Sequence, residues 1–514
     1  MEDVAQDASP DERRLHPWSW LFVLLQQLKQ FIFPLVALIV FGARKSSGDG
    51  ELWASLAPVI GIAVLVVLAI LQYFTYRYTI GRDGLTVREG LLHRSRREIP
   101  FSRIHNVVVH QSLLHRVFGV AEVRLESAGG VKPEAQMRVL GLRDALVLEN
   151  LVRHQARGTT ANANATESDS PGTAPDERAT TLLSLSTMEV IRLGLISNRG
   201  MIVVAAGFGA MWQILPENRI EQVFRQGAQQ AYGYAEDLHL GWLGGAAGGI
   251  ALVGIALTLV RLLSVALALS QFHGFRLTEE PRRLMVERGL FTRLRTSVAR
   301  RRIQAWTLHE GVLHRLFKRR SLRIDTAVAE KSGQQDSRAL KDVAPIAPPD
   351  VCDALIGHVL PQVQWPRDDW RAVHASARWR LWLPSLAWLL PATLLAAWQV
   401  GAWGWLGLAW MLFAAVAARR QAHRMGWTMD DQIVAVRSGW WSRYWRFAEI
   451  DKLQALRLSR SPLDHRFGTA TLWLDTAGAN GIAAPLALRF VPVADARAVH
   501  ERLTTALSRR RLHW

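Results

Sequence analysis

Uncharged apolar runs alternate with polar, basic segments along this chain. Residues 52–76 contain no Asp, Glu, Lys or Arg, residues 240–260 form a second such run, and residues 381–418 form a third. Apolar residues also dominate 193–215 and, with polar interruptions, 18–41. A membrane span needs about 20 mostly apolar residues. The pattern therefore predicts membrane spans rather than the buried helices of a soluble protein.

The apolar runs fall into three pairs, which predicts six spans. The pairs are 20–42 with 52–74, 195–215 with 241–265, and 380–398 with 400–418. Because Gln26, Gln27, Lys29 and Gln30 interrupt the first run, we interpret Trp18–Gln30 as an amphipathic, partly interfacial segment that leads into the first span.

The segments between the pairs are basic, and this predicts their side of the membrane. Residues 75–157 contain 14 Lys and Arg against 8 Asp and Glu, and residues 273–345 contain 17 against 8. Lys and Arg concentrate on the cytoplasmic side of membrane proteins. We therefore expect these segments and both termini to be cytoplasmic.

The segment after each pair is an internal repeat. Residues Val87–Ala128, Val286–Ala327 and Val436–Ala477 align without a gap. Each copy has a glycine that suits a turn with positive φ, a leucine that we expect to be buried under a short helical turn, and a phenylalanine that follows it. These shared positions are Gly90, Gly289, Gly439, Leu114, Leu313, Leu463, Phe118, Phe317 and Phe467.

Each copy has the pattern of a small β domain. Short β-branched or alternating segments are separated by turn residues, which is typical of strands. Ser112 and Ser461 are predicted N-caps of the helical turn, whereas Glu310 at this place makes a weaker cap in copy two. Each copy closes with an amphipathic helix, and these helices are expected at Asp144–His154, Asp350–Leu360 and Asp495–Leu507. The prediction is a split barrel of about seven strands with a C-terminal capping helix.

The repeat resembles a known family. Ser112–Gly119 (Ser-Leu-Leu-His-Arg-Val-Phe-Gly) and the unit of helix pair plus β domain are similar to the bacterial membrane-flanked domain proteins, whose domains are pleckstrin-homology-like (PH-like). The form with three copies and six spans resembles the YdbT group of that family. The resemblance implies a seven-stranded bent barrel closed by one helix and a location in the bacterial inner (plasma) membrane. It also implies a shorter companion with two spans and one domain.

These observations predict a multi-pass α-helical membrane protein with three cytoplasmic PH-like β domains. The expected parts are a polar N-terminus 1–17, helix pair 18–74, domain 75–155, flexible linker 156–181, helix pair 182–270, domain 271–362, helix pair 363–420 and domain 421–514.

Composition excludes several kinds of chemistry. The one cysteine, Cys352, excludes an internal disulfide and a cysteine-based metal site. The sequence has no nucleophile elbow, Walker loop or His-Glu-x-x-His motif, so we expect no catalytic site, cofactor or metal. Gly244–Gly249 lies within an expected span and suits close helix packing.

The net charge of +18 makes an anionic partner or surface the main functional question. Arg94, Arg96 and Arg97 in copy one and Arg300, Arg301 and Arg302 in copy two are candidate contacts for anionic lipid or a protein partner, although solvated strand edges also explain such runs. Nucleic acid is disfavoured because aromatic residues do not interleave with these arginines.

Three functions remain open. The first is a non-enzymatic scaffold for protein and lipid interactions, with envelope homeostasis as a candidate role. The second is a transporter or channel component built from the six helices, for which Lys29 and Arg261 are the ionisable residues nearest the hydrocarbon. The third is a lipid-modifying enzyme, which the lack of carboxylates and nucleophiles in the spans disfavours.

Overall fold

The computed structural model describes most of the chain. The described residues are 13–25, 27–28, 31, 51–81, 84–90, 95–101, 104–127, 135–161, 180–214, 222, 225–226, 229, 241–280, 283–326, 340–477 and 484–509. Most of the expected polar N-terminus, the expected span 20–42 beyond its first turns and residues 162–179 of the expected linker lie outside them.

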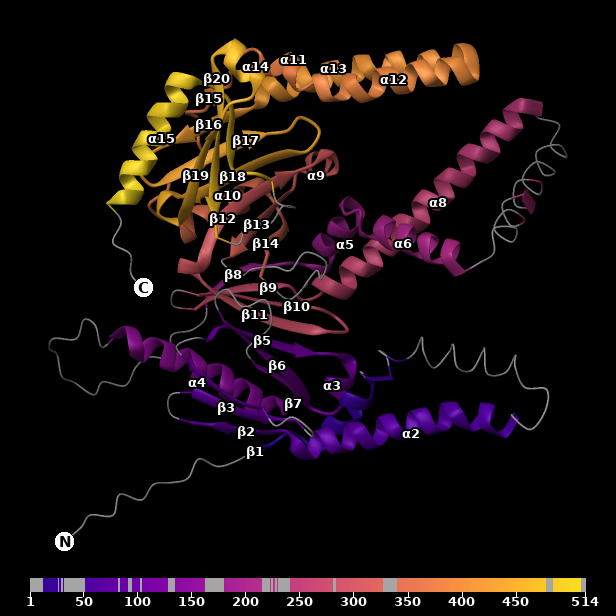
Figure 1. The fold of residues 1–514 in the computed structure, drawn as a ribbon, viewed down its shortest axis with the longest axis vertical. Coiled ribbons are helices and arrows are strands. Elements are labelled where there is room, and N and C mark those ends of the chain that lie inside the picture. Colours follow the sequence, from indigo (N-terminus) through magenta and orange to yellow (C-terminus); the bar gives the residue numbers. More distant parts are fainter. Residues whose placement is uncertain are drawn as a thin grey trace, which may run out of the picture.

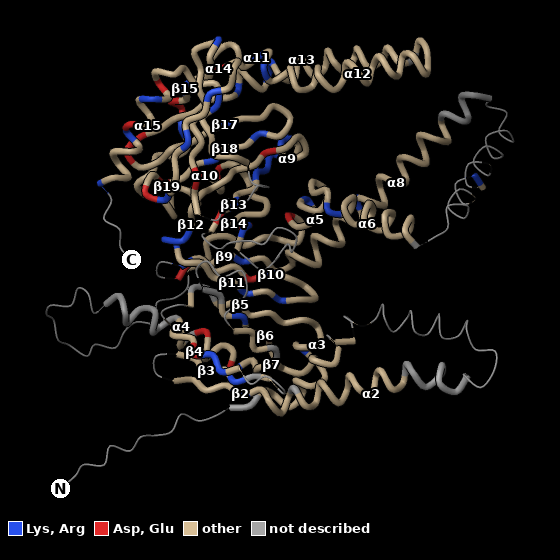
Figure 2. Tube along the Cα trace, viewed as in Figure 1, with Lys and Arg blue, Asp and Glu red and all other residues tan. Residues whose placement is uncertain are grey.

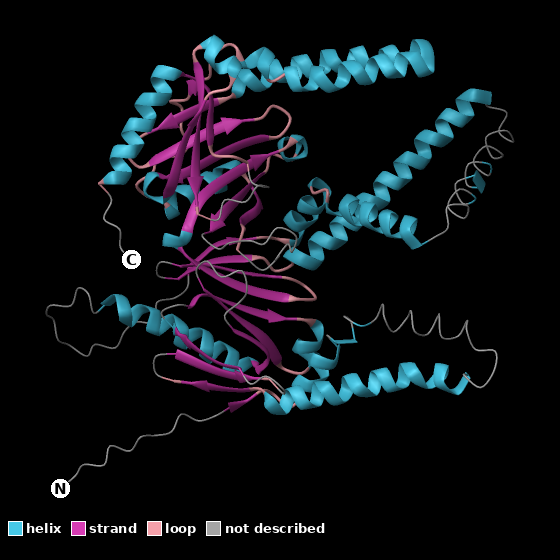
Figure 3. Cartoon of the chain, in the orientation of Figure 1, coloured by secondary structure: helices cyan, strands magenta, loops and turns pink. Residues whose placement is uncertain are grey.

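Three β modules form a column, and long helices project from one side of it (Figure 1). Figure 3 shows that strands make up the column, while the projecting elements are helical. In the described part of the chain, each module has seven strands. Those of the first are β1 (Arg13–Arg14), β2 (Arg77–Ile80), β3 (Gly84–Glu89), β4 (Ser95–Pro100), β5 (Ile104–Gln111), β6 (Val120–Ser127) and β7 (Ala135–Gly141).

The other two modules repeat this order. The second has β8 (Thr180–Ser184), β9 (Arg276–Glu280), β10 (Arg283–Arg288), β11 (Arg293–Ala299), β12 (Ile303–Glu310), β13 (Arg320–Thr326) and β14 (Asp342–Ala347). The third has β15 (Arg371–Ala372), β16 (Gly426–Met429), β17 (Ile433–Ser438), β18 (Arg443–Glu449), β19 (Leu453–Ser459), β20 (Thr469–Thr476) and β21 (Ala487–Pro492). The capping helices are α4 (Leu142–Ala161), α10 (Pro349–Val359) and α15 (Val493–Ser508).

The first strand of each module precedes the projecting helices. β1, β8 and β15 pair antiparallel with β2, β9 and β16, which follow those helices in the chain. The expected boundaries at 75, 271 and 421 put the helix pair in front of the domain. In the structure the helices are instead an insertion between the first two strands. Similarly, α4 runs through Ala161, so helix occupies the first residues of the expected linker.

Neighbouring modules share their β-sheets. Within a module, the first four strands form one half-sheet and the last three form the other. The last half-sheet of the first module joins the first half-sheet of the second through β5 and β11, and β12 joins β18 in the same way. Two seven-stranded sheets result, in the orders β7-β6-β5-β11-β10-β9-β8 and β14-β13-β12-β18-β17-β16-β15.

Each module has its own core between the two half-sheets and the capping helix. One residue from the first half-sheet, one from the second and one from the capping helix lose all contact with solvent in every module. These residues are Leu85, Leu125 and Leu148 in the first module, Leu284, Leu322 and Ile356 in the second, and Val434, Leu472 and Leu503 in the third. Burial of such side chains stabilises a fold by about 1.5–3 kcal/mol each.

The projecting helices are apolar, and most of their described side chains are exposed. They are α2 (Glu51–Thr75), α5 (Thr187–Ile196), α6 (Arg199–Ile214), α8 (Gly241–Phe272), α12 (Leu383–Val400) and α13 (Leu406–Arg424). Figure 2 shows few charged residues along the outer lengths of α8 and α12. Exposed apolar area of this extent is typical of a lipid-facing surface.

Two helical stretches in the described part of the chain are long and apolar enough to span a membrane, Ala247–Phe272 and Ala377–Val400. A third span results if α5 and α6, which meet at a bend of 52°, count as one. This finding does not confirm the expected six spans, although it agrees with a membrane protein.

The bend between α5 and α6 is held by contacts with α8. Arg261 Nη1 donates to the carbonyls of Leu195 and Ser197, both at 3.1 Å, so backbone groups freed by the bend are satisfied. A Cβ on Gly200 would lie 2.4 Å from Ser264 Oγ, which explains why only glycine fits there. Of the glycines expected to pack closely, Gly248 and Gly249 do not, because a Cβ added to either would have nothing within 4 Å of it. The surroundings of Gly244 and Gly245 lie outside the described part of the structure.

Candidate functional site

The turn between the third and fourth strand of the second module lies against a membrane helix. Gly289 N donates to His273 O and Leu290 N donates to Ser270 O, both at 2.9 Å, at the C-terminal end of α8. Gly289 has φ of 113°, and a Cβ there would lie 1.9 Å from Thr292 O. Glycine is therefore required, and the turn faces the end of α8.

The equivalent turn of the third module contacts α13. Gly439 has φ of 87°, and the rings of Trp440 and Trp441 lie 6.1 and 6.5 Å from the ring of Phe413 on α13. Arg420, also on α13, lies over the Trp440 ring at 5.2 Å. Gly90 of the first module has φ of 112°, and the four residues after it lie outside the described part of the chain.

The short helix of each repeat lies at the same end of its module. These helices are α3 (Leu113–Val117), α9 (Val312–Leu316) and α14 (Pro462–Phe467). Arg116 Nη1 on α3 donates to Leu290 O at 2.9 Å, and Arg315 Nη2 on α9 donates to Trp441 O at 3.2 Å. The short helices of the first two modules are thus each attached to the next module, at the turn between its third and fourth strand. We call this turn the membrane-side turn.

These helices and turns expose apolar side chains together. Val117 is 78% exposed and Leu316 is 74% exposed. We call this set the membrane-side surface, and its members are Leu113, Val117, Leu290, Phe291, Leu316 and Trp441, all of which are exposed. Apolar side chains that gather at the base of membrane helices are suited to the interface between water and lipid.

The repeated leucines are more exposed than the sequence predicts. Leu114 is 45% exposed and Leu463 is 37% exposed, while Leu313 is partly buried against the core of the second module. The reason is the position of the short helices, which lie on the outside of the module beside the membrane helices rather than over its core. Sequence periodicity marks these residues as apolar but does not separate contact with a core from contact with lipid.

In the first and third modules, the repeated phenylalanine anchors the segment that leads into the helix pair. The ring of Phe118 lies 4.6 Å from that of Trp18, and the ring of Phe467 lies 5.2 Å from that of Trp379. Phe317 packs against the core of the second module. Aromatic contacts thus connect the module to the start of the helices in the first and third copies.

A buried ion pair fixes the third helix pair to its module. Arg380, just before α12, contacts Asp464 of α14 at 2.9 Å, and both side chains are almost fully buried. Burial alone would raise the pKa of Asp464, but hydrogen bonds from Arg380, Thr469 and Ser461 hold it well below the usual value for Asp. Asp464 also completes a capping box with Ser461.

A different ion pair takes this role in the second module. Glu189 on α5 accepts two hydrogen bonds from Arg319, at 2.7 and 2.9 Å. Lys318, with φ of 51°, stands where the other copies have glycine, and the N-cap of α9 is Gly311 rather than the expected Glu310. Copy two therefore lacks the side-chain cap and uses the Glu189–Arg319 pair at this joint.

The two arginine clusters do not form one site. Arg96 and Arg97 lie exposed on β4, where Arg96 pairs with Glu98 at 2.6 Å. Arg94 lies outside the described residues. Arg300, Arg301 and Arg302 form a 3₁₀ helix between β11 and β12.

The second cluster lies at the far end of β11 from α8. Since a strand rises about 3.3 Å per residue, the seven residues of β11 place Arg300 about 20 Å from the membrane-side turn. Arg300 pairs with Glu279, and burial together with the charges of Arg301 and Arg283 lowers the pKa of Arg302 to about 10. These arginines therefore lie away from the turn that contacts α8.

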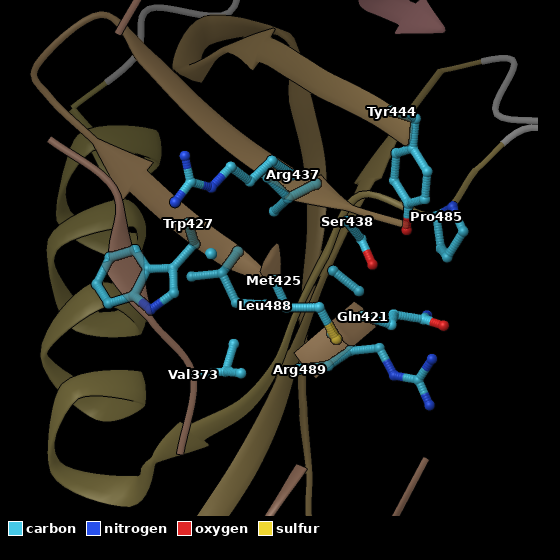
Figure 4. A pocket seen from close by; sticks show the side chains of 13 residues that line it. Val373, Gln421, Met425, Trp427, Arg437, Ser438, Tyr444, Pro485, Leu488 and Arg489 are labelled. Carbon is cyan, nitrogen blue, oxygen red and sulfur yellow. The ribbon is translucent and has the colours of Figure 1, made fainter. Parts of the chain in front are cut away.

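The described residues contain a small pocket at the base of α13 (Figure 4). Its volume is about 50 Å³, and its lining includes Gln421, Arg437, Tyr444 and Arg489. Ligand pockets for small molecules usually measure roughly 300–1,000 Å³. Among the described residues no group of three or more His, Cys, Asp or Glu side chains is arranged to hold a metal ion.

Sequence reasoning missed the pairing between modules. The signal was present in the aligned fifth strands, where copy one has Val108, copy two has Thr307 and copy three has Arg457. A long charged side chain in one copy indicates an edge that stays open, whereas short or apolar side chains suit a strand with neighbours on both sides.

Comparison with known proteins gives one family and one relative. The family described as "Bacterial PH domain" matches residues 23–156, 238–347 and 381–507. The UPF0699 transmembrane protein YdbT of Bacillus subtilis (strain 168) is 19% identical over 315 residues, which are 60% of this chain. The match covers 61% of the length of that relative. No solved structure matches the chain.

Proposed function

This chain belongs to the bacterial PH domain family, and from that premise we propose that it is a non-enzymatic membrane scaffold whose three linked modules present one surface to the bilayer and another to partners. Its similarity to a transmembrane protein and its apolar helices support a place in the membrane. The scaffold role is our inference from the way the modules are joined.

The observation that carries this proposal is the common direction of the helices. Figure 1 shows α2, α8, α12 and α13 leaving the same side of the column, and α4 and α15 lying on the opposite side. Because shared sheets join the modules, one bilayer can hold all the helices only if the column lies along its surface. The membrane-side surface then meets the lipid interface in each module.

The finer topology is also a proposal. Six spans would place all three modules and both termini in the cytoplasm of a bacterial inner membrane. The basic segments between the helix pairs support this orientation. Reporter fusions after Pro349 and Trp514 should both give a cytoplasmic signal, and a periplasmic signal from either would exclude the scheme.

Contact with anionic lipid is proposed for arginines beside the membrane-side surface. Arg116 and Arg315 lie next to exposed apolar residues of that surface. Each such cation contributes on the order of 1 kcal/mol near an anionic leaflet. Arg300–Arg302 are less suited to this role because of their distance from α8, so we assign them to packing and to protein contact.

Support for a transporter or channel is weaker. Arg261 lies closest to the hydrocarbon among the described candidates, but its guanidinium is engaged by carbonyls at the bend of α5 and α6. This contact gives the residue a structural role. A scaffold therefore fits the described residues better than a conducting path.

Depth measurements on the reconstituted full chain test the scaffold geometry. Spin labels on Val117→Cys and Leu316→Cys should be accessible to oxygen and protected from a water-soluble nickel complex. A label on Arg497→Cys, which is exposed on α15 at the far side of the column, should show the opposite behaviour. Equal accessibility at all three positions would rule out the proposed membrane-side surface.

A further inference from the structure

The repeated edge pairing has two open ends. β11 and β18, the last strands of their half-sheets, each pair with a strand of the preceding module. β4 is the equivalent strand of the first module, and no strand of the described residues pairs with its outer edge. β19 is the corresponding open end of the third module.

Comparison of equivalent residues shows which positions on β4 and β19 a paired strand would bury. Arg97 on β4 is exposed, whereas the equivalent residues, Thr296 on β11 and Arg446 on β18, are buried. On the other open edge, Ala455 of β19 is exposed, whereas its equivalent Ala305 on β12 is completely buried. Both ends therefore expose positions that the interior interfaces bury.

The two interfaces inside the chain also show which side chains meet the strands equivalent to β4. Arg295 on β11 contacts Glu149 of the preceding module at 3.5 Å. Arg446 on β18 contacts Asp325 of the preceding module at 2.5 Å. Arg295 aligns with Arg96 of β4 and Arg446 aligns with Arg97. At each interior interface, one of these two positions therefore carries an arginine that meets a carboxylate of the preceding module.

A second copy of this chain is a poor occupant of the β4 edge. Both interior interfaces use one register, in which Val108 faces Thr296 and Thr307 faces Arg446. The same register between β19 of one copy and β4 of another places Arg457 opposite Arg97. Like charges directly opposite each other destabilise a strand pair. The contact is also heterologous, so without this repulsion copies could assemble into open chains.

We propose that the outer edge of β4 binds the exposed edge strand of a PH-like module on another polypeptide, and that this module carries a carboxylate opposite Arg97. The partner would extend the array by one module at its N-terminal end, in the geometry of the two interior interfaces. The arginines on β4 and β19 keep copies of this chain from occupying that place. This inference rests on the sheet pairing and does not depend on lipid contact.

An acidic version of β19 serves as a probe of this chemistry. The probe chain carries Arg457→Glu and Ser459→Cys, and the acceptor chain carries Ser95→Cys. The shared register places Ser459 opposite Ser95, and paired residues on adjacent strands have Cα atoms about 4.5–5.5 Å apart, within reach of a disulfide. Cys352, the natural cysteine, is buried and does not compete.

The test is a charge exchange with full-length chains mixed in mild detergent under oxidising conditions. We expect the acidic probe to cross-link to the acceptor about tenfold more than a probe that retains Arg457. Adding Arg97→Glu to the acceptor should reverse the preference. As a matched control, a probe with Arg457 retained and Arg497→Glu on exposed α15 has the same net charge as the acidic probe and should cross-link weakly.

Each outcome decides the proposal. A preference that follows the sign of the charges at 97 and 457 supports it. No cross-link with any probe would show that the β4 edge does not accept a strand. Equal cross-linking with the unchanged Arg457 probe would make a second copy the occupant, and this result would overturn the role given to the arginines.

Discussion

At the first interface between modules, β5 pairs with β11 from Arg293 to Thr296, and the core of the first module contains only residues of that module among those described. At the second interface, β12 pairs with β18 from Arg443 to Phe447. There the core of the second module includes Phe447 of the third, and the core of the third includes Ala305 of the second.

The polar contacts differ in the same direction. Arg446 at the second interface is 2% exposed, and its guanidinium reaches Asp325 and donates to Thr307 Oγ1. Arg295 at the first interface is partly exposed and divides its contacts between Glu149 and Glu287. The same backbone arrangement therefore gives a tightly packed joint in one place and a more solvated joint in the other. We expect the second and third modules to unfold as one unit and the first to separate from them more easily.

The largest expected effect is at the aromatic centre of the second interface. Phe447 is completely buried, and its ring lies 4.7 Å from Trp365 and 6.4 Å from Trp306. Phe447→Ala should lower the free energy of unfolding by about 3–5 kcal/mol, because it leaves a cavity shared by two modules. Denaturant unfolding in detergent measures this loss, and the exposed Phe291→Ala is the control.

A smaller effect is expected when one partner of the ion pair is neutralised at each interface. Asp325→Asn should cost about 3 kcal/mol because it leaves the buried guanidinium of Arg446 without its counter-charge. Glu149→Gln should cost roughly 1 kcal/mol or less, because it removes the charge of the buried partner and leaves the partly exposed Arg295 with Glu287 and solvent. Equal losses for the two variants in the same unfolding measurement would contradict the contrast between the interfaces.

The second interface should also weaken in acid. Burial, with the nearby charges of His309 and Arg323, lowers the pKa of His314 to about 4, and burial also lowers the pKa of His309. Because the unfolded state takes up a proton near pH 6.5 and the folded state only near pH 4, stability falls as the pH drops through this window.

This acid effect should be modest. We expect a loss of about 1 kcal/mol at pH 5 relative to pH 7, after allowance for partial solvent screening. Unfolding curves at the two pH values measure it. His314→Gln should reduce the difference, and an unchanged difference in that variant would assign the acid sensitivity to another group.

The smallest effect is expected at the repeated leucines. Leu114→Ala and Leu463→Ala should each cost less than about 1 kcal/mol in detergent because these side chains are largely exposed. Leu313→Ala should cost more, since Leu313 packs against a core. A loss of several kcal/mol at Leu114 would mean that the short helix is buried.

Local features of the fold could be predicted from the sequence because local residues determine them. The turn glycines at 289 and 439 adopt positive φ, Ser461 caps α14, and a helix closes each module. Each of these depends on neighbours within a few residues or on a simple amphipathic pattern.

The joints between modules depend on pairing across long sequence separations. β5 and β11 are almost 200 residues apart, and β8 and β15 are short strands separated from their modules by the membrane helices. The residue pattern marks an edge strand that stays open, as Arg457 does on β19, but it does not identify which distant strand pairs with which. The prediction that the repeated leucines are buried failed for a related reason. An apolar residue that faces lipid cannot be distinguished in the sequence from one that faces a protein core.

The sheet that joins the first two modules is the central feature of this architecture. A His110→Cys and Leu294→Cys variant places one cysteine on each side of this joint at positions that face each other in β5 and β11. We predict rapid formation of an intramolecular disulfide in the full-length chain, as for the pair Ser459→Cys and Thr471→Cys within one sheet. Failure of the first pair to form a disulfide while the second pair forms one would show that the modules are not joined by a common sheet.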